Sequence, residues 1–302
     1  MRIKASLAAA AVAIGFVTAS TGSAVGATTP APKNGDLVFL VGFGGITTQA
    51  PGEGSYHGVT EGDEPKYSPN GKQLAFLRSG DVWVRTLSTG AERQVTHTGG
   101  TVGAYLAWSG DAKSIVTSDG NQLEKVKVST GAVTTLYTAS TAVQQPAWSP
   151  DGTLIAFSTG TAIKTITSSG TGLRTVSSGG SNTFPDWRPD SKVLAFITTR
   201  FTGKSEMVTV PRTATSATTP FRVSWKAYPQ GLHHIGVAWS PDGKKIAVLQ
   251  FNANHEPNDQ DTDERFKVRA YLPDGTHSYS LTGPIVGDDG PEGLDWAPKL
   301  TS

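Results

Sequence analysis

The chain has 302 residues, of which 37% are hydrophobic and 17% charged, with 26 Lys and Arg against 25 Asp and Glu. A balance this close to neutral argues against nucleic acid or an anionic membrane surface as a partner. Cysteine is absent, which excludes disulfides, a thiolate nucleophile and Cys-based metal centres. The 35 glycines favour short strands joined by tight turns over long helices.

Residues 1–27 are expected to be a secretory signal peptide. Arg2 and Lys4 precede an apolar run from Leu7 to Val17, and "VGA" at 25–27 is a small-residue cleavage site. The alternative is a membrane anchor, but spanning a bilayer takes roughly 20 apolar residues. Cleavage would remove two of the 26 basic residues and leave 24 against 25 acidic ones. We expect a protein without membrane insertion that is secreted to the extracellular space or to the periplasm and cell envelope.

Residues 28–35, "TTPAPKNG", form a Pro- and Thr-rich linker before a single domain over 36–298. Within that domain an aromatic residue recurs before a polar turn, as in "WSPDG" at Trp148 and Trp239. We call these residues the anchors: Tyr67, Trp108, Trp148, Trp187, Trp239 and Trp296. Their intervals are 41, 40, 39, 52 and 57 residues. Repeats of about 40 to 45 residues with strand patterns and no helix are typical of propeller blades.

Each repeat has the same internal order. After the anchor turn comes an apolar strand such as Ile155 to Phe157, then a third strand, a turn such as "STG" at 88–90, and an outer strand. This predicts four antiparallel strands per repeat. The first repeat lacks an anchor strand, whereas the anchor at Trp296 has no strands after it. We therefore expect an all-β, monomeric, six-bladed β-propeller closed by the C-terminal strand pairing into the N-terminal blade.

Three features together carry a family resemblance: "WSPDG", an "IAF"-like strand, and an outer strand with the pattern Gly-x-x-Arg-Gln-Val-Thr at 90–96. They resemble the WD40-like Pro-Asp repeat of the TolB-like β-propellers, over about residues 35–298. Members of this wider family include the propeller of the Tol-Pal translocation protein, the propeller domains of prolyl-oligopeptidase-like peptidases and free-standing secreted propellers. The resemblance therefore implies a fold and does not imply one activity.

The anchor motif is interpreted as architecture. In "SPDG" at 149–152 the Pro sets the first turn corner, the Asp accepts hydrogen bonds from nearby backbone and the Gly supplies a positive φ. The alternative is a ring of catalytic or metal-binding carboxylates at Asp111, Asp151, Asp190 and Asp242. Equivalent positions of successive blades lie around a circle and do not meet at its centre, which argues against that alternative. Asn70 replaces the Asp in the first copy, as a turn allows.

The first strand of each blade is expected to line a central channel. The residues just before the anchors would then approach its mouth: Glu64, Tyr105, Gln145, Phe184, Gly236 and Gly293. A mixed polar and aromatic mouth suits a peptide or a sugar. The alternative is a water-filled channel without a ligand.

Three irregular loops, over 224–235, 251–265 and 283–294, are expected to converge on one face near that mouth. Candidate ligand-binding residues on them are Trp225, Tyr228, His233, His234 and Asp288. The two histidines next to acidic loops suggest a metal site, with a polar surface pair as the alternative. The oxygen-rich group Asp259, Asp261, Asp263 and Glu264 suggests calcium, with a solvated acidic loop as the alternative. No other cofactor is expected.

No Gly-x-Ser-x-Gly nucleophile elbow occurs in the sequence, and no catalytic residue is assigned. The sequence therefore favours a non-enzymatic scaffold that binds a protein or peptide partner through the loop-rich face. The alternative is a polysaccharide lyase or hydrolase with a metal-assisted site at the channel mouth.

Overall fold

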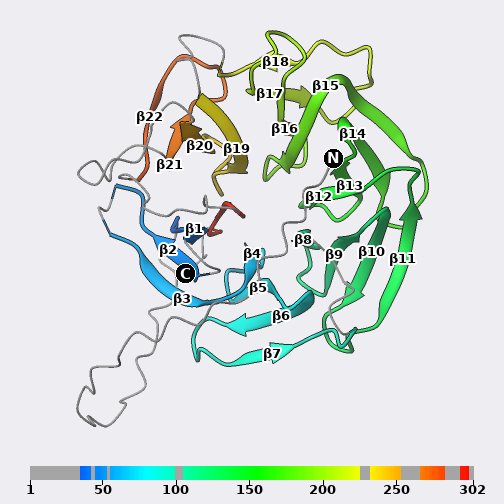
Figure 1. The fold of residues 1–302 in the computed structure, drawn as a ribbon, viewed down its shortest axis with the longest axis vertical. Coiled ribbons are helices and arrows are strands. Elements are labelled where there is room, and N and C mark those ends of the chain that lie inside the picture. Colours follow the sequence, from blue (N-terminus) through cyan, green and yellow to red (C-terminus); the bar gives the residue numbers. More distant parts are fainter. Residues whose placement is uncertain are drawn as a thin grey trace, which may run out of the picture.

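The structure is a computed structural model that describes residues 35–41, 45–52, 55–98, 105–224, 232–252, 266–282 and 293–298. Over these ranges the regular structure consists of strands β1 to β23, in antiparallel sheets. Figure 1 shows the sheets arranged around a common centre, with β4, β8, β12 and β19 nearest to it and β3, β7, β11 and β22 at the periphery. The described part of the chain contains no helix long and apolar enough to cross a bilayer.

Four sheets have four strands each. The first holds β23 (Asp295–Trp296), β1 (Leu37–Val41), β2 (Gly45–Gln49) and β3 (His57–Glu61), in that order. The second holds β4 (Asp63–Tyr67), β5 (Gln73–Arg78), β6 (Asp81–Thr86) and β7 (Glu92–Gln94). The third holds β8 (Tyr105–Trp108), β9 (Ser114–Asp119), β10 (Gln122–Lys127) and β11 (Val133–Thr138). The last holds β19 (Leu232–Trp239), β20 (Ile246–Asn252), β21 (Phe266–Tyr271) and β22 (Ser278–Ser280).

The remaining sheet has seven strands. They are β12 (Gln144–Trp148), β13 (Leu154–Ser158), β14 (Gly160–Thr167), β15 (Arg174–Trp187), β16 (Val193–Thr198), β17 (Glu206–Pro211) and β18 (Phe221–Arg222). Strand β15 is 14 residues long; its first part pairs with β14 and its last part, from Asn182, pairs with β16. Two units that the repeat predicts as separate sheets are therefore joined, because the outer strand of one runs on into the anchor strand of the next.

The two ends of the described chain are hydrogen-bonded neighbours. Strand β23 pairs antiparallel with β1, with Leu37 opposite Trp296 and Val38 opposite Asp295. The Trp296 Nε1 donates to the Gly35 carbonyl at 2.6 Å, and the Ala297 amide donates to the Asp36 carbonyl at 2.8 Å. The last anchor strand thus adds to the first sheet, at the position that the first repeat lacks.

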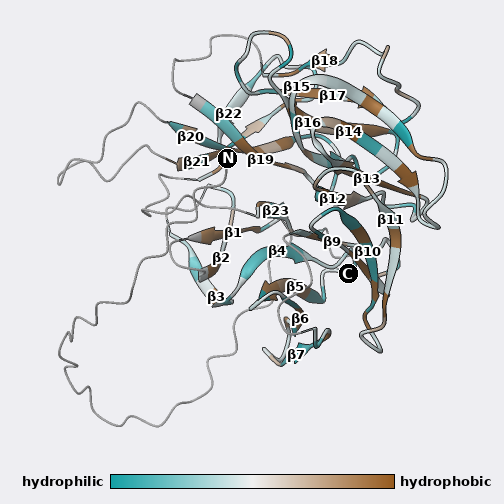
Figure 2. Ribbon diagram, turned by 45° about the vertical axis from the view of Figure 1, so that its right-hand side comes forward, coloured by the Kyte–Doolittle hydropathy of each residue, from teal (hydrophilic) through white to brown (hydrophobic). Residues whose placement is uncertain are grey.

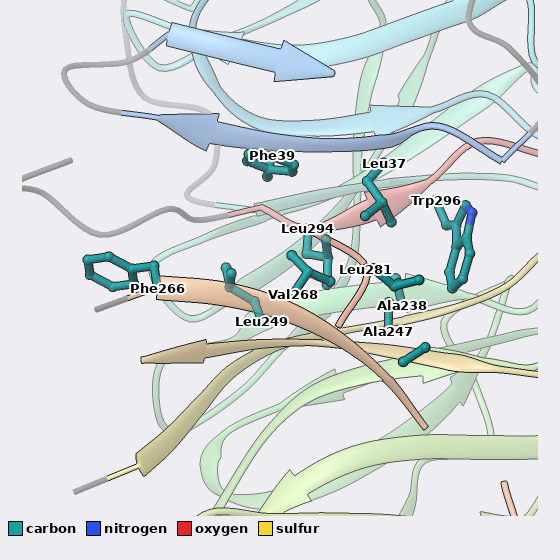
Figure 3. Close-up of a cluster of buried hydrophobic side chains, with 11 residues drawn as sticks. Leu37, Phe39, Ala238, Ala247, Leu249, Phe266, Val268, Leu281, Leu294 and Trp296 are labelled. Atoms are coloured by element: carbon teal, nitrogen blue, oxygen red, sulfur yellow. The ribbon is translucent and has the colours of Figure 1, made fainter. Parts of the chain in front are cut away.

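Apolar side chains gather between successive sets of strands. The described residues form six buried clusters, and each joins two neighbouring sets, including the pair within the seven-stranded sheet. Figure 3 shows the cluster in which Leu37 and Phe39 of β1 face Leu249, Val268 and Leu294. Because both faces of a sheet are covered, middle strands such as β5 read as apolar runs, whereas the outer strands β3 and β22 are mostly hydrophilic (Figure 2).

The predicted signal peptide over 1–27 and residues 28–34 of the predicted linker lie outside the described residues. Gly35, the last residue of that linker, is the first residue described. These boundaries stay predictions.

Candidate functional site

The anchor turns satisfy their own polar groups, as predicted for turns. The Asp151 Oδ1 accepts hydrogen bonds from the Ser149 hydroxyl at 2.6 Å and from the Thr153 amide at 3.1 Å. The Ser149 Oγ in turn accepts the Leu154 amide at 2.9 Å. Burial raises the pKa of Asp151, but the hydrogen bonds from Ser149, Thr153 and Arg212 outweigh it and bring the pKa down to about 2.

The other turn carboxylates have the same local bonds. Ser109 and Ser240 donate to Asp111 and Asp242, and Arg188 donates to Asp190. Each bond lowers the pKa of its carboxyl. Their own turns hold these carboxylates, Arg212 also binds Asp151, and none of the four lines the central channel.

The anchors also wall a cavity on the axis of the molecule, of about 390 Å³. Its wall contains all six anchor side chains, Tyr67, Trp108, Trp148, Trp187, Trp239 and Trp296. Prolines of the anchor strands and turns fill the spaces between them, among them Pro69, Pro150, Pro189, Pro241 and Pro298. The repeated aromatic residue, interpreted from the sequence as architecture, is therefore at the same time the surface of a cavity large enough for a ligand.

Charged side chains enter this cavity from the position just before the anchor. Three repeats have alanine there, namely Ala107, Ala147 and Ala238, whereas the other three have Lys66, Asp186 and Asp295. Lys66, Asp186 and Asp295 all line the cavity.

Each of these three side chains bonds across to a neighbouring strand set. The Asp186 Oδ2 accepts the Trp239 amide at 2.7 Å, and the Asp295 Oδ2 accepts the Tyr67 amide at 2.7 Å. The Lys66 Nζ donates to the Leu294 carbonyl at 2.7 Å. The charges are thereby held in place by the backbone of β19, β4 and the residue before β23.

Enclosure by protein changes the ionisation of both carboxyls. Burial raises the pKa of Asp186 to about 7, helped by the nearby Asp295 and opposed by the Trp239 amide and by Lys66. Burial also raises the pKa of Asp295, against the influence of Lys66 and the Tyr67 amide. The cavity therefore brings together one basic and two acidic side chains, and the raised pKa of Asp186 places its titration near neutral pH.

The anchor side chains differ in how their polar atoms are bonded. The indole N–H of Trp108 donates to the Lys66 carbonyl at 3.0 Å, and that of Trp187 donates to the Ala147 carbonyl at 3.2 Å. The Trp239 Nε1 and the Tyr67 hydroxyl are buried without a hydrogen-bond partner among the described residues. Tyr67 and Trp239 are also the two anchors whose backbone amides donate to an aspartate of a neighbouring strand set. Two polar atoms packed inside the protein next to the cavity therefore form no hydrogen bond with a described residue.

The ring of residues predicted at the channel mouth does come together. Glu64, Tyr105, Gln145, Phe184, Gly236 and Gly293 all line a second cavity, of about 40 Å³. It adjoins the first, because Lys66, Pro146, Pro185 and Val237 line both. Its volume is close to that of a single water molecule, about 30 Å³ in the liquid. The room for a ligand therefore lies at the anchor end of the channel, and ligand binding by the predicted ring stays a prediction.

Three non-glycine residues of that ring have left-handed backbone. The φ angles are 50° at Glu64, 51° at Gln145 and 53° at Phe184, and a proline follows each. The pairing of β4, β12 and β15 shifts register at these points, so each is a bulge in an anchor strand. The Gln145 Oε1 accepts the Phe184 amide at 2.9 Å, which ties two of these bulges together.

The two predicted histidines have different surroundings. His233 is exposed and its ring stacks on Phe251, with centroids 6.1 Å apart. His234 is 4% exposed, and its Nε2 lies 3.0 Å from the Nε2 of Gln250. Burial, with a smaller effect of His233, lowers the pKa of His234 to about 3. Successive residues of a strand point to opposite faces, so this pair is not arranged to bind one metal ion together.

The remaining predicted residues lie outside the described residues: Trp225, Tyr228, Asp288, Asp259, Asp261, Asp263 and Glu264. Calcium binding by the acidic loop and a role for the loop-rich face stay predictions. In the described part of the chain, no group of three or more His, Asp or Glu side chains is placed to hold one metal ion.

Comparisons with known proteins agree with this architecture. Residues 53–109 match the family model of the dipeptidyl peptidase IV (DPP IV) N-terminal region. TolB from Acinetobacter baumannii superposes with a TM-score of 0.68 at 18% identity, over 90% of this chain and 69% of that one. The fold is that of a TolB-like β-propeller.

Two other similar structures show how widely this propeller architecture is used. A chain of a nidogen/laminin complex matches with a TM-score of 0.68 at 12% identity, over 87% of this chain and 98% of that one. An oligogalacturonate lyase in complex with manganese matches with a TM-score of 0.54 at 14% identity, over 79% and 70%. No curated protein matches this chain in sequence. At these identities the likeness extends to the fold alone.

Sequence reasoning missed Lys66, Asp186 and Asp295. A signal for them was present, since the residue before the anchor is alanine in half of the repeats and charged in the other half. Reading each repeat position by position for departures from its own consensus would have found them.

Proposed function

We propose that this TolB-like propeller is a secreted, monomeric, non-enzymatic scaffold that binds a protein or peptide partner in its axial cavity. The observation that carries this proposal is the cavity itself. Its volume of about 390 Å³ is within the range of about 300 to 1,000 Å³ usual for ligand sites. Its wall is mainly aromatic and proline side chains, with three charged groups, which is the composition that anchors a peptide segment.

The fold is a suitable carrier for such a site. We propose six blades, with the seven-stranded sheet counted as two units that share β15, and a ring completed by β23 and β1. Six apolar clusters, one at each junction between successive strand sets, support this count. A ring of rigid blades holds the six anchors at fixed positions, so these side chains lose little conformational entropy when a ligand binds.

The location outside the cytoplasmic membrane is proposed from the N-terminal sequence. The alternative function, a polysaccharide lyase or hydrolase, has the fold likeness to the oligogalacturonate lyase as its support. A likeness at 14% identity carries a fold and not an activity.

A pair of alanine substitutions in the third sheet tests the cavity. Ala107 lines the cavity, so Ala107→Phe fills it, whereas Ala132 is exposed beside β11 at the outer edge of the same sheet. The protein without residues 1–27 is immobilised and exposed to culture medium and cell-envelope extract of the source cells. We expect a partner retained by the wild type and by Ala132→Phe and lost, at least tenfold, with Ala107→Phe.

Both variants are first compared with the wild type by circular dichroism and thermal unfolding. Capture that is equal for the two folded variants would place binding elsewhere, with the loop-rich face as the next surface to test.

A further inference from the structure

The charges in the axial cavity do not balance. Lys66 from β4, Asp186 from β15 and Asp295 from β23 carry one positive and two negative charges when all are ionised. Among the described residues that line the cavity, Lys66 is the only cation. An uncompensated charge enclosed by protein is costly. The site is therefore short of one positive charge.

The three groups cannot move far to relieve this imbalance. Lys66 is held by the Leu294 carbonyl, and the two carboxylates are held by the amides of Trp239 and Tyr67, all at 2.7 Å. Each carboxylate accepts its amide through Oδ2. The geometry is preorganised for a donor that arrives from the cavity.

The walls suit a cation as well. An indole face attracts an ammonium or a guanidinium. Two anchor indoles already attract basic groups of the chain that do not line the cavity: the Lys125 Nζ lies 5.8 Å from the Trp148 ring, and the Arg188 Cζ lies 5.8 Å from the Trp239 ring.

We infer that the cavity receives the ammonium of a lysine or the guanidinium of an arginine, carried on the peptide segment that it binds. This inference rests on the proposed function and adds the chemical class of the inserted group. One basic group would make the net charge of the site zero.

A proton is the competitor for the same role. Burial raises the pKa of Asp186 to about 7, so below neutral pH a proton supplies part of the missing charge. The groups that act on Asp186 are Lys66 on β4, Asp295 on β23, the Trp239 amide on β19 and the Trp187 amide that follows it on β15. Because the bound cation needs the ionised form, binding should strengthen as the pH rises through 7. With a pKa near 7, affinity should be about 30-fold weaker at pH 5.5 than at pH 8.

The probes are four pools of capped heptapeptides with random flanking residues and a central residue that is lysine, arginine, norleucine or glutamate. Each pool is passed over the immobilised protein at pH 8 and at pH 5.5. We expect the lysine and arginine pools to be retained at least tenfold better than the norleucine pool at pH 8, with the preference much reduced at pH 5.5.

Two variants test the residues. In Asp186→Asn and in Asp186→Asn/Asp295→Asn the amide oxygen can still accept the Trp239 or Tyr67 amide, so the junctions are kept. Asp186→Asn leaves one positive and one negative charge, as protonation of Asp186 does, so we expect it to show at pH 8 the reduced lysine and arginine preference that the wild type shows at pH 5.5. We expect the double variant to have no such preference at either pH. Thermal unfolding checks that both are folded.

The outcomes separate the inference from the proposed function. Equal retention of the lysine and norleucine pools, abolished by Ala107→Phe, would overturn the basic-group inference and leave the proposed function standing. Retention of none of the four pools would contradict both. A lysine preference that survives in the double variant would also overturn the inference.

Discussion

The position before each anchor shows how one residue decides what a repeated strand does. With alanine at 107 or 147, the side chain adds apolar wall and no charge to the cavity. With aspartate at 186 or 295, the same position binds the amide of the next anchor and adds a charge to the cavity. These two carboxyls therefore bind backbone amides of the anchors and also bring charge to the cavity.

The burial of Asp186 should make the unfolding free energy of the protein depend on pH. The pKa of Asp186 in the folded state, about 7, lies above its ordinary value of 3.8. Its contribution to stability is therefore complete below pH 3.8 and is lost as the pH rises through 7. Between pH 5 and pH 8 we expect the wild type to lose about 2.5 kcal/mol of unfolding free energy relative to Asp186→Asn.

Urea unfolding at several pH values measures this difference. Asp190→Asn is the control, because hydrogen bonds from Arg188 and the Lys192 amide keep the pKa of Asp190 below its ordinary value. That variant should run parallel to the wild type from pH 5 to pH 8. A parallel course for Asp186→Asn would mean that the carboxyl is not enclosed as described.

At the scale of the element, turn glycines decide how closely neighbouring strand sets approach. Gly131, in the turn between β10 and β11, has a φ of +71°, and a Cβ placed there would lie 2.1 Å from the Val95 carbonyl of the preceding sheet. Gly152, in the anchor turn after β12, has nearly the same φ of +74° but nothing within 4 Å of such a Cβ. Both glycines therefore need a positive φ, but only at Gly131 would a side chain collide with the neighbouring sheet.

This pair separates backbone strain from crowding. Gly152→Ala should lower the unfolding free energy by about 1 to 2 kcal/mol, the cost of a left-handed non-glycine residue. Gly131→Ala should cost at least about 2 kcal/mol more, because the Val95 backbone has to move as well. Urea unfolding of the two variants checks the difference, and equal losses would show that the sheets are less closely packed at Gly131.

At the scale of the whole molecule, the apolar core is divided among the junctions between strand sets and does not form one centre. The junction that joins the last sheet to the first includes Trp296 and Leu294 together with Leu37 and Phe39 of β1. Only two residues of β23 pair with β1, so side-chain packing supplies most of what holds this junction.

Trp296 therefore offers a test of how far the junction matters. Trp296→Ala should cost about 3 to 5 kcal/mol through lost packing. Trp296→Phe retains most of the packing but loses the hydrogen bond from Nε1 to the Gly35 carbonyl. It should lower the unfolding free energy by about 1 kcal/mol. In Trp296→Ala, amide hydrogen exchange should accelerate in β9 as well as in β1. Acceleration confined to β1 would show that the junction stabilises only its own sheet.

The period of the anchors predicts the strand sets, their four-stranded order and the placement of the last anchor strand beside β1. It also predicts that Glu64, Gln145 and Phe184 lie together. These are consequences of repetition, because equivalent residues of repeated units occupy equivalent places around one axis. The same reasoning works for the turn carboxylates, whose hydrogen bonds are made within a few residues.

The amino-acid sequence by itself determined the strand pattern, because alternation and turn chemistry act over a few residues and the repeat copies them. Tertiary structure alone decided how deeply Asp186 and Asp295 are buried beside Lys66, that His233 and His234 face different surroundings, and that the wide end of the channel is the anchor end. The physical reason is distance and enclosure. How much water a carboxyl loses, and which charge stands near it, depend on strands more than a hundred residues apart, and no local pattern encodes that.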